Sequence, residues 1–231
     1  MNTIVIIVAA GSGSRYGGPL PKQFCMLAGR PVLMHTIDAF RRALPEAKVL
    51  VVLSDDMTNL WADMCSEMSY AGSQIITGGA TRYHSVRNAL DAIADADDTS
   101  IVLIHDGARP IVSPHLIANV TGRLLQGDVA GVVPAIAVTD SLRRVLPDND
   151  RLTCAVARAG LYAVQTPQAF TLATISKAYA AVAYSDALTD DASVVEAAGL
   201  GRIAIAEGDS RNIKITRPGD IDIAAQFIKG V

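Results

Sequence analysis

The sequence predicts an α/β protein with a mostly parallel sheet, helices on both faces of that sheet and a protruding β-hairpin arm. Three observations lead to this prediction. Apolar runs fill residues 4–10 and most of 48–53 and 100–105, and such runs are typical of strands buried on both faces. Segments with apolar residues at helical spacing alternate with these runs, as in a sheet built with crossover helices. One region past the middle of the chain alternates with a period of two instead.

The first half of the chain alternates regularly between strand and helix signals. After the strand at 4–10, helical spacing predicts a helix over 31–44, which Pro45 ends. A buried strand over 48–53 comes next, followed by a helix that Asp55 or Asp56 could cap and that runs to about residue 68. Residues 73–77 predict a short strand, and Thr81 begins the next helix.

The second half resumes the alternation after one interruption. The strand at 100–105 leads into Asp106, a helix begins at Pro114, and a strand is expected over 129–138. Near the C-terminus we expect strands over 201–206 and 212–215 and a helix over 218–229. Strands that alternate with helices in this way predict parallel neighbours.

Residues 135–165 form the interruption. They alternate in polarity and contain a polar turn at 147–151 between two extended runs, which predicts a β-hairpin. Such an arm cannot bury its own backbone, so it packs on its own domain or on a second subunit. Since the chain has no linker and no internal repeat, we expect one domain over 1–231 with a β-arm excursion at about 137–164.

Composition limits the classes of function. The 231 residues are 50% hydrophobic and 19% charged, with a net charge of −3, so a broad basic surface for nucleic acid is not expected. Cys25, Cys65 and Cys154 are odd in number and lack metal or disulfide spacing. The N-terminus lacks the basic start of a signal peptide, and the run at 4–10 is too short to span a membrane. We expect a cytoplasmic protein with no membrane partner.

The loop after the first strand has the composition of a polyphosphate cradle. Gly11 and Gly13 leave backbone N–H groups free to face a ligand, Arg15 supplies a planar guanidinium, and Lys22 adds a point charge. The loop lacks the third glycine of a dinucleotide fingerprint and the Ser or Thr of a Walker A motif. An ordinary strand-to-helix turn is the alternative interpretation.

Other strand ends carry polar residues of the same kind. These are Gly78, Gly79 and Arg82 after the third strand, Asp106 and Arg109 after the fourth, and Lys214 at the last. Ligands of open parallel sheets bind at the carboxyl ends of the strands, so these groups are expected to converge. Asp106 could hold Mg²⁺ against phosphates, accept from a ribose hydroxyl, or simply pair with Arg109. The chain has no nucleophile motif, and transfer of a nucleotidyl group to an anionic acceptor needs none.

Seven motifs, in this order, resemble those of a known family. They are 9-AAGSGSR-15, 21-PKQ-23, 78-GGATRYHSV-86, 105-HDGARP-110, 166-TPQ-168, 189-TDDAS-193 and 212-NIKIT-216. Together they resemble the 2-C-methyl-D-erythritol 4-phosphate cytidylyltransferases of the non-mevalonate isoprenoid pathway. The resemblance implies a Rossmann-like nucleotidyltransferase domain that transfers CMP from CTP to 2-C-methyl-D-erythritol 4-phosphate. It also implies Mg²⁺ and a homodimer with interlocked β-arms.

The resemblance extends to individual residues. It implies catalytic roles for Arg15, Lys22 and Lys214, and it places Asp106 on the ribose or the Mg²⁺ side. Nucleotide-binding positions are Ala9, Ala10, Gly11, Gly13, Gly79, Ala80, Ser85, Asp106 and Gly107. Positions on the acceptor side are Arg109, Ser141, Arg158, Thr166 and Thr189. Since Ser141 and Arg158 lie on the arm, the resemblance implies that they enter the partner subunit's site.

Two other functions remain open from the sequence. The related ribitol 5-phosphate cytidylyltransferases share most of these motifs, although residues 158–161 and 189–193 match the methylerythritol enzyme better. A nucleotide-binding domain that has lost its chemistry is the alternative from another class. The chain also departs from some family members, because Ala80 stands where they carry an acidic residue and Ser141 replaces a more common Thr.

Overall fold

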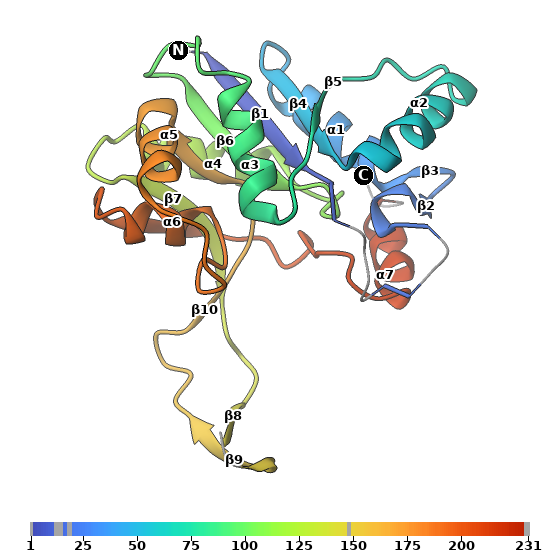
Figure 1. Cartoon of the computed structure of the whole chain (residues 1–231). Helices are drawn as coiled ribbons and strands as arrows, with labels where there is room; N and C mark the ends of the chain where they lie inside the picture. Colours follow the sequence, from blue (N-terminus) through green and yellow to red (C-terminus); the bar gives the residue numbers. More distant parts are fainter. Residues whose placement is uncertain (1, 12–15, 18–19, 147–148, 229–231) are drawn as a thin grey trace.

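The computed structural model describes residues 2–11, 16–17, 20–146 and 149–228. Its centre is a sheet with the strand order β10-β7-β11-β6-β1-β4-β5, with β12 also paired to β7 (Figure 1). The strands of this sheet are β1 (Thr3–Val8), β4 (Lys48–Leu53), β5 (Gln74–Thr77), β6 (Ile101–Asp106), β7 (Gly131–Ala137), β10 (Tyr162–Val164), β11 (Gln168–Thr171) and β12 (Ile203–Glu207). The helices are α1 (Val32–Ala43), α2 (Thr58–Glu67), α3 (Arg82–Asp91), α4 (Pro114–Leu124), α5 (Leu172–Ala181), α6 (Asp191–Ala197) and α7 (Gly219–Ile228).

The sheet is parallel at its centre and mixed at one side. β1 pairs in parallel with both β4 and β6, β5 continues this array beside β4, and β12 runs parallel to β7. β11 is antiparallel to β6 and to β7, and β10 is antiparallel to β7. In the register of β1 and β6, Val8 lies opposite Asp106, so both strands end at the same edge. The predicted α/β class with a mostly parallel sheet is confirmed.

Helices cover both faces of the sheet, because alternate residues of each central strand are apolar on both faces and must be buried. On β1, Val5 and Ile7 pack into a core with α1 and α4, whereas Ile4 and Ile6 pack into a second core with α3 and α5. This division explains the continuous apolar run in the sequence, because neither face of β1 meets water. In Figure 1, α3, α5 and α6 lie in front of the sheet and α1 lies behind it.

Side-chain caps set the starts of several helices. Thr81, Ser113, Thr171 and Asp190 each accept a hydrogen bond from a backbone N–H of the first turn. The start at Thr81 agrees with the prediction. The predicted cap at Asp55 or Asp56 is wrong, because both residues lie inside a short 3₁₀ turn, η2 (Asp55–Met57), which precedes α2 and has no side-chain cap.

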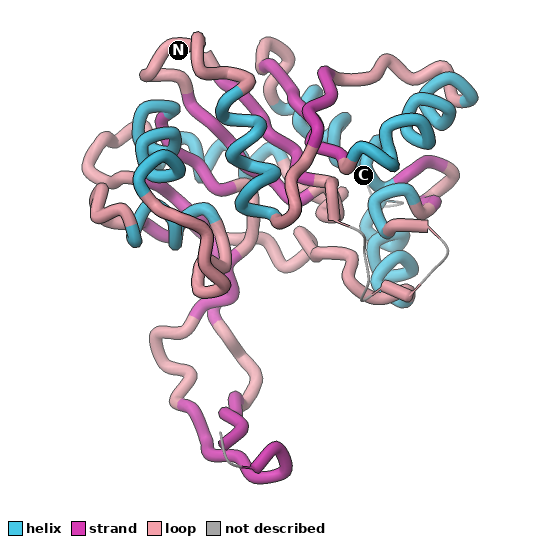
Figure 2. Tube along the Cα trace, in the orientation of Figure 1, coloured by secondary structure: helices cyan, strands magenta, loops and turns pink. Residues whose placement is uncertain are grey.

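A β-hairpin arm projects from the body, as the sequence predicts. β8 (Leu142–Leu146) and β9 (Asn149–Val156) pair antiparallel, and β10 joins β7 at the base of the arm. Figure 2 shows extended loops that carry the hairpin away from the helices and the sheet. Residues 147–148 of the predicted turn lie outside the described residues.

A third, small cluster of apolar residues lies beside the sheet. Helix α7 packs there with the short hairpin of β2 (Met26–Leu27) and β3 (Arg30–Pro31), and Leu27, Ala108 and Ile215 form its buried centre. The predicted strand over 212–215 is wrong, because this segment is an irregular loop between β12 and α7. One backbone bond, from Ile215 N to Ala108 O at 2.8 Å, ties it to the loop after β6. No helix in the described ranges is long and apolar enough to cross a membrane.

Candidate active site

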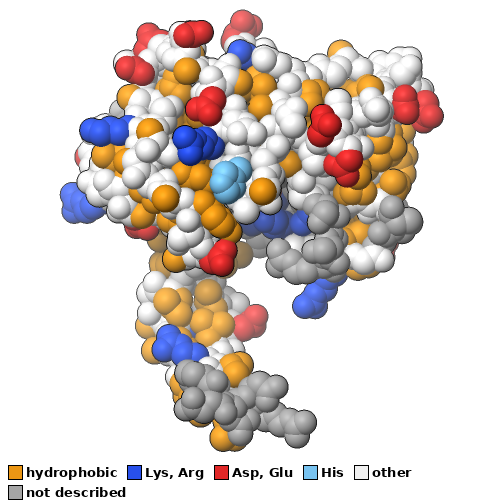
Figure 3. Space-filling view, in the orientation of Figure 1, with side chains coloured by type: hydrophobic (Ala, Val, Ile, Leu, Met, Phe, Trp, Pro, Cys, Tyr) orange, Lys and Arg blue, Asp and Glu red, His pale blue; other side chains and the backbone are white. Residues whose placement is uncertain are grey.

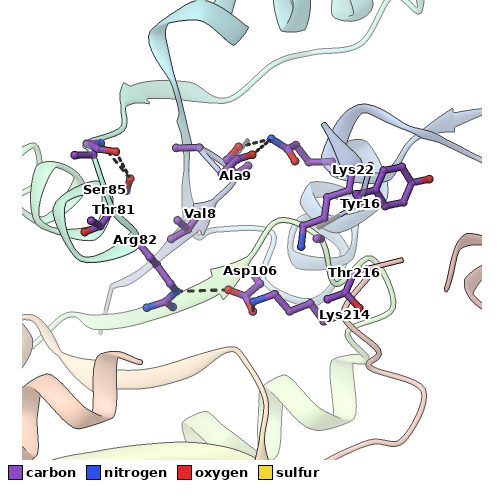
Figure 4. A pocket seen from close by; sticks show the side chains of 16 residues that line it. Val8, Ala9, Tyr16, Lys22, Thr81, Arg82, Ser85, Asp106, Lys214 and Thr216 are labelled. Carbon is purple, nitrogen blue, oxygen red and sulfur yellow. Dashed lines mark hydrogen bonds and ion pairs between the residues drawn. The ribbon is translucent and has the colours of Figure 1, made fainter. Parts of the chain in front are cut away.

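The main cavity lies at the carboxyl edge of β1, β5 and β6 and has a volume of about 670 Å³. That volume is in the range of a small-molecule pocket, roughly 300–1,000 Å³. Figure 4 shows its side chains converging from separate elements. The lining residues are Val8, Ala9, Ala10, Gly11, Tyr16, Lys22, Gln23, Gly79, Ala80, Thr81, Arg82, Ser85, Asp106, Ala108, Lys214 and Thr216.

The wall formed by the end of β1 is held by a buried glutamine. Gln23 is 2% exposed, and its Nε2 donates to Ala9 O at 2.7 Å and to Gly11 O at 3.0 Å. Gln23 belongs to a short 3₁₀ helix, η1 (Lys22–Phe24), so the same turn that places Lys22 at the cavity also fixes the loop after β1. The predicted residues Gly13 and Arg15 lie outside the described residues.

The opposite wall is formed where β5 leads into α3. Gly79 N donates to Ser85 Oγ at 3.1 Å, which folds the Gly-Gly turn back over the first turn of α3. A Cβ at Gly78 would stand 2.5 Å from the Cβ of Ala10, so this position must be glycine for the two walls to approach closely. Ala10, Gly79 and Ser85 therefore line a narrow slot with backbone groups and small side chains.

Asp106 lies between three cations at the floor of the cavity. Its Oδ2 is 2.9 Å from Lys214 Nζ and 3.3 Å from Arg109 Nε, and its Oδ1 is 3.6 Å from Arg82 Nε. Figure 4 shows Arg82 and Lys214 approaching this carboxylate from opposite sides. Burial alone would raise the pKa of Asp106, but Arg82, Lys214 and Arg109 outweigh burial and hold it far below its usual range. The carboxylate is therefore ionised at every physiological pH.

Arg82, the first residue of α3, is anchored from behind. Its Nη1 and Nη2 donate to the two oxygens of Asp191 at 2.8 and 2.6 Å, and Tyr179 also donates to Asp191, at 2.7 Å. Asp191 is fully buried. Burial lowers the pKa of Arg82, but Asp191 and then Asp106 raise it above its ordinary value overall. The guanidinium is thus a permanent and fixed positive charge.

A buried polar chain supports Asp106 from the side of β6. The Asp106 N–H donates to Thr166 Oγ1 at 3.1 Å, and Thr166 Oγ1 lies 3.0 Å from His105 Nδ1. His105 Nε2 lies 3.0 Å from Arg109 O, a pure acceptor, so Nε2 carries the proton and Nδ1 accepts from Thr166. Burial lowers the pKa of His105 to about 4, which keeps the ring neutral. His105 is thus a satisfied interior histidine.

Arg109 belongs to the same support. Its Nη1 donates to Asn212 O at 2.7 Å, and its Nε contacts Asp106. Burial lowers the pKa of Arg109, and the nearby charge of Asp106 only partly offsets this. Arg109 therefore couples the loop that carries Lys214 to the end of β6, and it does not line the cavity. The sequence left open that Asp106 simply pairs with Arg109. That ion pair exists, but it is one of three that Asp106 makes, beside those with Arg82 and Lys214.

The remaining predicted residues lie in three places. Gly107 stands behind the cavity wall, where a Cβ would lie 2.8 Å from the Cβ of Ala9. Thr189 lines a second cavity of about 110 Å³, which shares Thr81 and Arg82 with the first. Ser141 and Arg158 are exposed at the ends of the arm hairpin, outside both cavities of their own chain. Arg158 Nη1 donates to Thr139 O within the arm.

Sequence reasoning did not assign several residues that line the cavity. Thr81 and Gln23 were present in the motifs but were given no role in the site, and Arg82 was expected there only as one of the converging strand-end groups. Thr216 ends the last motif, and Tyr16 directly follows the first. Their position within the motifs was the available signal. Their roles depend on contacts with distant segments, such as the pairing of Arg82 with Asp191.

The described residues do not form a resident metal site. No group of three or more His, Cys, Asp or Glu side chains in the described ranges could hold an ion. Asp106 has the hard oxygen donors that Mg²⁺ prefers, but three cations already surround it. A magnesium ion would fit beside Asp106 if it were carried by an anionic ligand that offsets these charges.

This arrangement defines the class of protein before any relative is considered. A slot lined by backbone groups adjoins a set of lysine and arginine side chains, at the sheet edge where α/β proteins bind nucleotides. Cations without a nucleophile or a general base can stabilise charge on transferring phosphates. The fold and site are those of an α/β protein that binds a nucleotide and acts on its phosphates.

Comparisons with known proteins agree with this class and narrow it. The sequence model of the 2-C-methyl-D-erythritol 4-phosphate cytidylyltransferase family matches residues 3–230. A protein of that name from Cereibacter sphaeroides is 43% identical over 228 residues, covering 99% of this chain and 97% of that protein. One from Bacteroides thetaiotaomicron is 38% identical over 229 residues, covering 99% of this chain and all of that protein.

Solved structures give the same answer. The enzyme of that name from Thermus thermophilus superposes with a TM-score of 0.75 at 31% identity, covering 99% of this chain and all of that one. A 4-diphosphocytidyl-2C-methyl-D-erythritol synthase superposes with a TM-score of 0.81 at 29% identity, with the same coverage. The chain belongs to the 2-C-methyl-D-erythritol 4-phosphate cytidylyltransferase family, as its motifs predicted.

Proposed function

We propose that this protein transfers the cytidylyl group of CTP to the phosphate of 2-C-methyl-D-erythritol 4-phosphate. A phosphate oxygen of the acceptor attacks the α-phosphorus of CTP, and the bond from that phosphorus to the oxygen bridging to the β-phosphate breaks. The products are 4-diphosphocytidyl-2-C-methyl-D-erythritol and pyrophosphate. A phosphomonoester has a second pKa of about 6, so the acceptor is mostly dianionic at neutral pH and needs no base.

The observation that carries this proposal is the meeting of Lys22 and Lys214, from opposite ends of the chain, beside the slot of Ala10, Gly79 and Ser85. We propose that this slot, lined by small side chains and backbone groups, takes the cytosine base, whose edge those backbone groups can hydrogen-bond. Lys22 and Lys214 supply positive charge where the triphosphate and the acceptor phosphate must meet. Arg15 is proposed to act with Lys22 in stabilising the transition state.

Lys214 is proposed to change partners when substrate binds. It lies against Asp106 Oδ2, yet its side chain is 35% exposed and free to turn toward a phosphate. Arg82 and Arg109 stay with Asp106 because their other nitrogens are fixed by Asp191 and by Asn212 O. Lys214 can therefore leave without stranding a buried carboxylate.

We propose that Mg²⁺ would be brought to the site as part of the CTP ligand, where it would supply positive charge to the phosphates. Asp106 is the carboxylate among the described lining residues, and it could approach this ion once Lys214 has turned away. Bound Mg²⁺ would neutralise charge that develops on the leaving pyrophosphate. Thr189 is proposed to face the acceptor from the second cavity.

We further propose a homodimer in which each arm reaches the partner's site. The arm exposes Val145, Leu152 and Tyr162 at 54, 55 and 48% of their surfaces, more apolar area than an isolated hairpin should leave in water (Figure 3). A second copy would cover this surface and would bring Ser141 and Arg158 to the acceptor phosphate. The three free cysteines support a reducing, cytoplasmic location.

Pyrophosphate release tests the function. The protein should release pyrophosphate when CTP, Mg²⁺ and 2-C-methyl-D-erythritol 4-phosphate are supplied together, and much less when ATP replaces CTP. Turnover with ribitol 5-phosphate alone would overturn the proposed acceptor. A Lys22→Ala variant should retain the fold but lose turnover. If wild type binds CTP but releases no pyrophosphate with either acceptor, the protein is a nucleotide-binding domain without this chemistry.

A further inference from the structure

The acidic pair of the 189–193 motif has structural partners that the proposed function leaves unexplained. Asp190 caps α6, and its Oδ2 accepts from Gln168 Nε2 at 2.8 Å. Asp191 is fully buried and binds both terminal nitrogens of Arg82. A buried carboxylate with a two-pronged arginine is a rigid unit, since two parallel charge-assisted bonds fix the plane of the guanidinium. Arg82 is thus fixed in position by a segment far along the chain.

The third nitrogen of Arg82 faces the cavity. Nε lies 3.6 Å from Asp106 Oδ1, and Arg82 itself lines the main cavity (Figure 4). Because Nη1 and Nη2 are both bound to Asp191, Arg82 cannot turn to follow an incoming phosphate. Its charge therefore stays beside one oxygen of Asp106 whether or not a ligand is present.

The two oxygens of Asp106 have different surroundings. Oδ2 receives Lys214 and Arg109, at 2.9 and 3.3 Å. Oδ1 has the ion pair with Arg82 at 3.6 Å, which is longer than a hydrogen bond, and no donor in the described ranges hydrogen-bonds it. Oδ1 is therefore the oxygen with acceptor capacity for a ligand. Three neighbouring cations favour a neutral hydroxyl donor there over a bare cation.

We propose that Arg82 is a positioning residue of the nucleotide site: anchored by Asp191, it holds the ionised Asp106 so that Oδ1 accepts from a sugar hydroxyl of the nucleotide. This inference rests on the proposed function, because it takes CTP as the ligand. It gives the buried Asp191 a role in nucleotide recognition, through Arg82 and Asp106. The competing account is that Arg82 only neutralises Asp191 and supports the fold.

The test compares CTP with 2′,3′-dideoxy-CTP by calorimetric titration in Mg²⁺, in wild type and in an Arg82→Lys variant. Lysine can pair with Asp191 or with Asp106 but not with both. Wild type should bind CTP about tenfold more tightly than the dideoxy analogue, the effect of one good charge-assisted hydrogen bond. The Arg82→Lys variant should bind CTP about tenfold more weakly than wild type does, but its affinity for the dideoxy analogue should stay within about twofold of the wild-type value.

Two matched variants separate positioning from folding. Arg87→Lys changes the same residue type on the exposed side of α3 and should leave the ratio of the two affinities unchanged. Tyr179→Phe removes a hydrogen bond to Asp191 but not the contacts of Arg82, so it should lower the melting temperature without changing the ratio. If the Arg82→Lys variant does not fold, an Asp191→Asn variant can replace it, because this change weakens the same anchor. It should reduce the ratio of the affinities for CTP and for the dideoxy analogue.

Three results would count against the inference. An equal loss for CTP and the analogue in Arg82→Lys would make the effect a general one on the pocket. An unchanged ratio in a folded variant would leave Arg82 with a structural role alone. Failure of the wild-type protein to bind CTP would overturn the proposed function and the inference together. This result is distinguishable from the other two because it is seen in the wild-type protein, without any substitution.

Discussion

At the scale of single residues, His105 shows how the fold holds a titratable group neutral. Burial lowers its folded-state pKa to about 4, whereas an unfolded histidine has a pKa of about 6.5. The unfolded chain therefore takes up the proton first as the pH falls. Stability that is fully present above pH ~6.5 is lost progressively until the pH reaches ~4, to a total of about 3 kcal/mol.

Urea unfolding at several pH values between these limits measures this loss. A His105→Gln variant keeps a donor for Arg109 O but cannot be protonated, so its free energy of unfolding should fall less steeply over the same window. The difference between the two proteins isolates His105 from carboxylates such as Asp106 and Asp220, whose pKa values are also lowered. Parallel pH curves for the two proteins would contradict the assignment.

Thr166 provides a second prediction at this scale. Its hydroxyl is buried and joins the Asp106 N–H to His105 Nδ1, so Thr166→Val should cost about 1–3 kcal/mol of stability by leaving both groups unsatisfied. Thr166→Ser should restore most of that loss. Thermal unfolding measures both variants. If Thr166→Val keeps wild-type stability and only raises the KM for the acceptor, then Thr166 acts on substrate and not through Asp106.

At the scale of elements, the sequence predicted those whose signal is local. β4 was predicted over its full extent, 48–53, because a continuous run of Val and Leu can only be buried on both faces. β11, α5 and α6 were not predicted. β11 is antiparallel among the central strands, and its place depends on pairing with β6, more than 60 residues earlier.

The incorrect strand at 212–215 has a physical explanation. Asn212 and Lys214 alternate with Ile213 and Ile215, which imitates a half-buried strand, but the buried partners lie in two different places. Asn212 is buried against Thr166 O, whereas Ile215 joins the small core of α7. Lys214 nevertheless lines the cavity, because the bond from Ile215 N to Ala108 O holds this loop beside the end of β6, where Lys214 pairs with Asp106.

Contact between β1 and β6 at the site gives a prediction for these elements. A Cβ at Gly107 would meet Ala9 Cβ at 2.8 Å and Val8 O at 3.2 Å, so Gly107→Ala should separate the two strand ends that carry Ala9 and Asp106. We expect a loss of about 1–3 kcal/mol in stability and a raised KM for CTP. Gly122→Ala is the matched control, since it has open space in α4 and should stabilise the protein by up to about 1 kcal/mol. Similar behaviour of both variants would mean that the strand ends are not closely packed.

At the scale of the whole molecule, the chain gathers positive charge locally while remaining acidic overall. Its net charge is −3, yet the cavity collects Lys22, Arg82 and Lys214 from its beginning, middle and end. The sequence could predict this convergence because the ends of parallel strands share an edge. It could not predict the anchor of Arg82, because Asp191 lies 109 residues away and no local pattern joins the two.

The arm supplies the last prediction, because its role requires a second copy of the chain. Lys22→Ala and Arg158→Ala should each inactivate the protein if both residues serve the reaction. In a mixed dimer, a site shared between subunits has one intact combination: Lys22 from one chain and Arg158 from the other. When equal amounts of the two variants exchange subunits at random, about half of the dimers are mixed. Each mixed dimer has one working site of its two, so activity should recover to about a quarter of wild type. Sites built within one chain would each lack a residue, and no activity would return although mass spectrometry showed that subunits had exchanged.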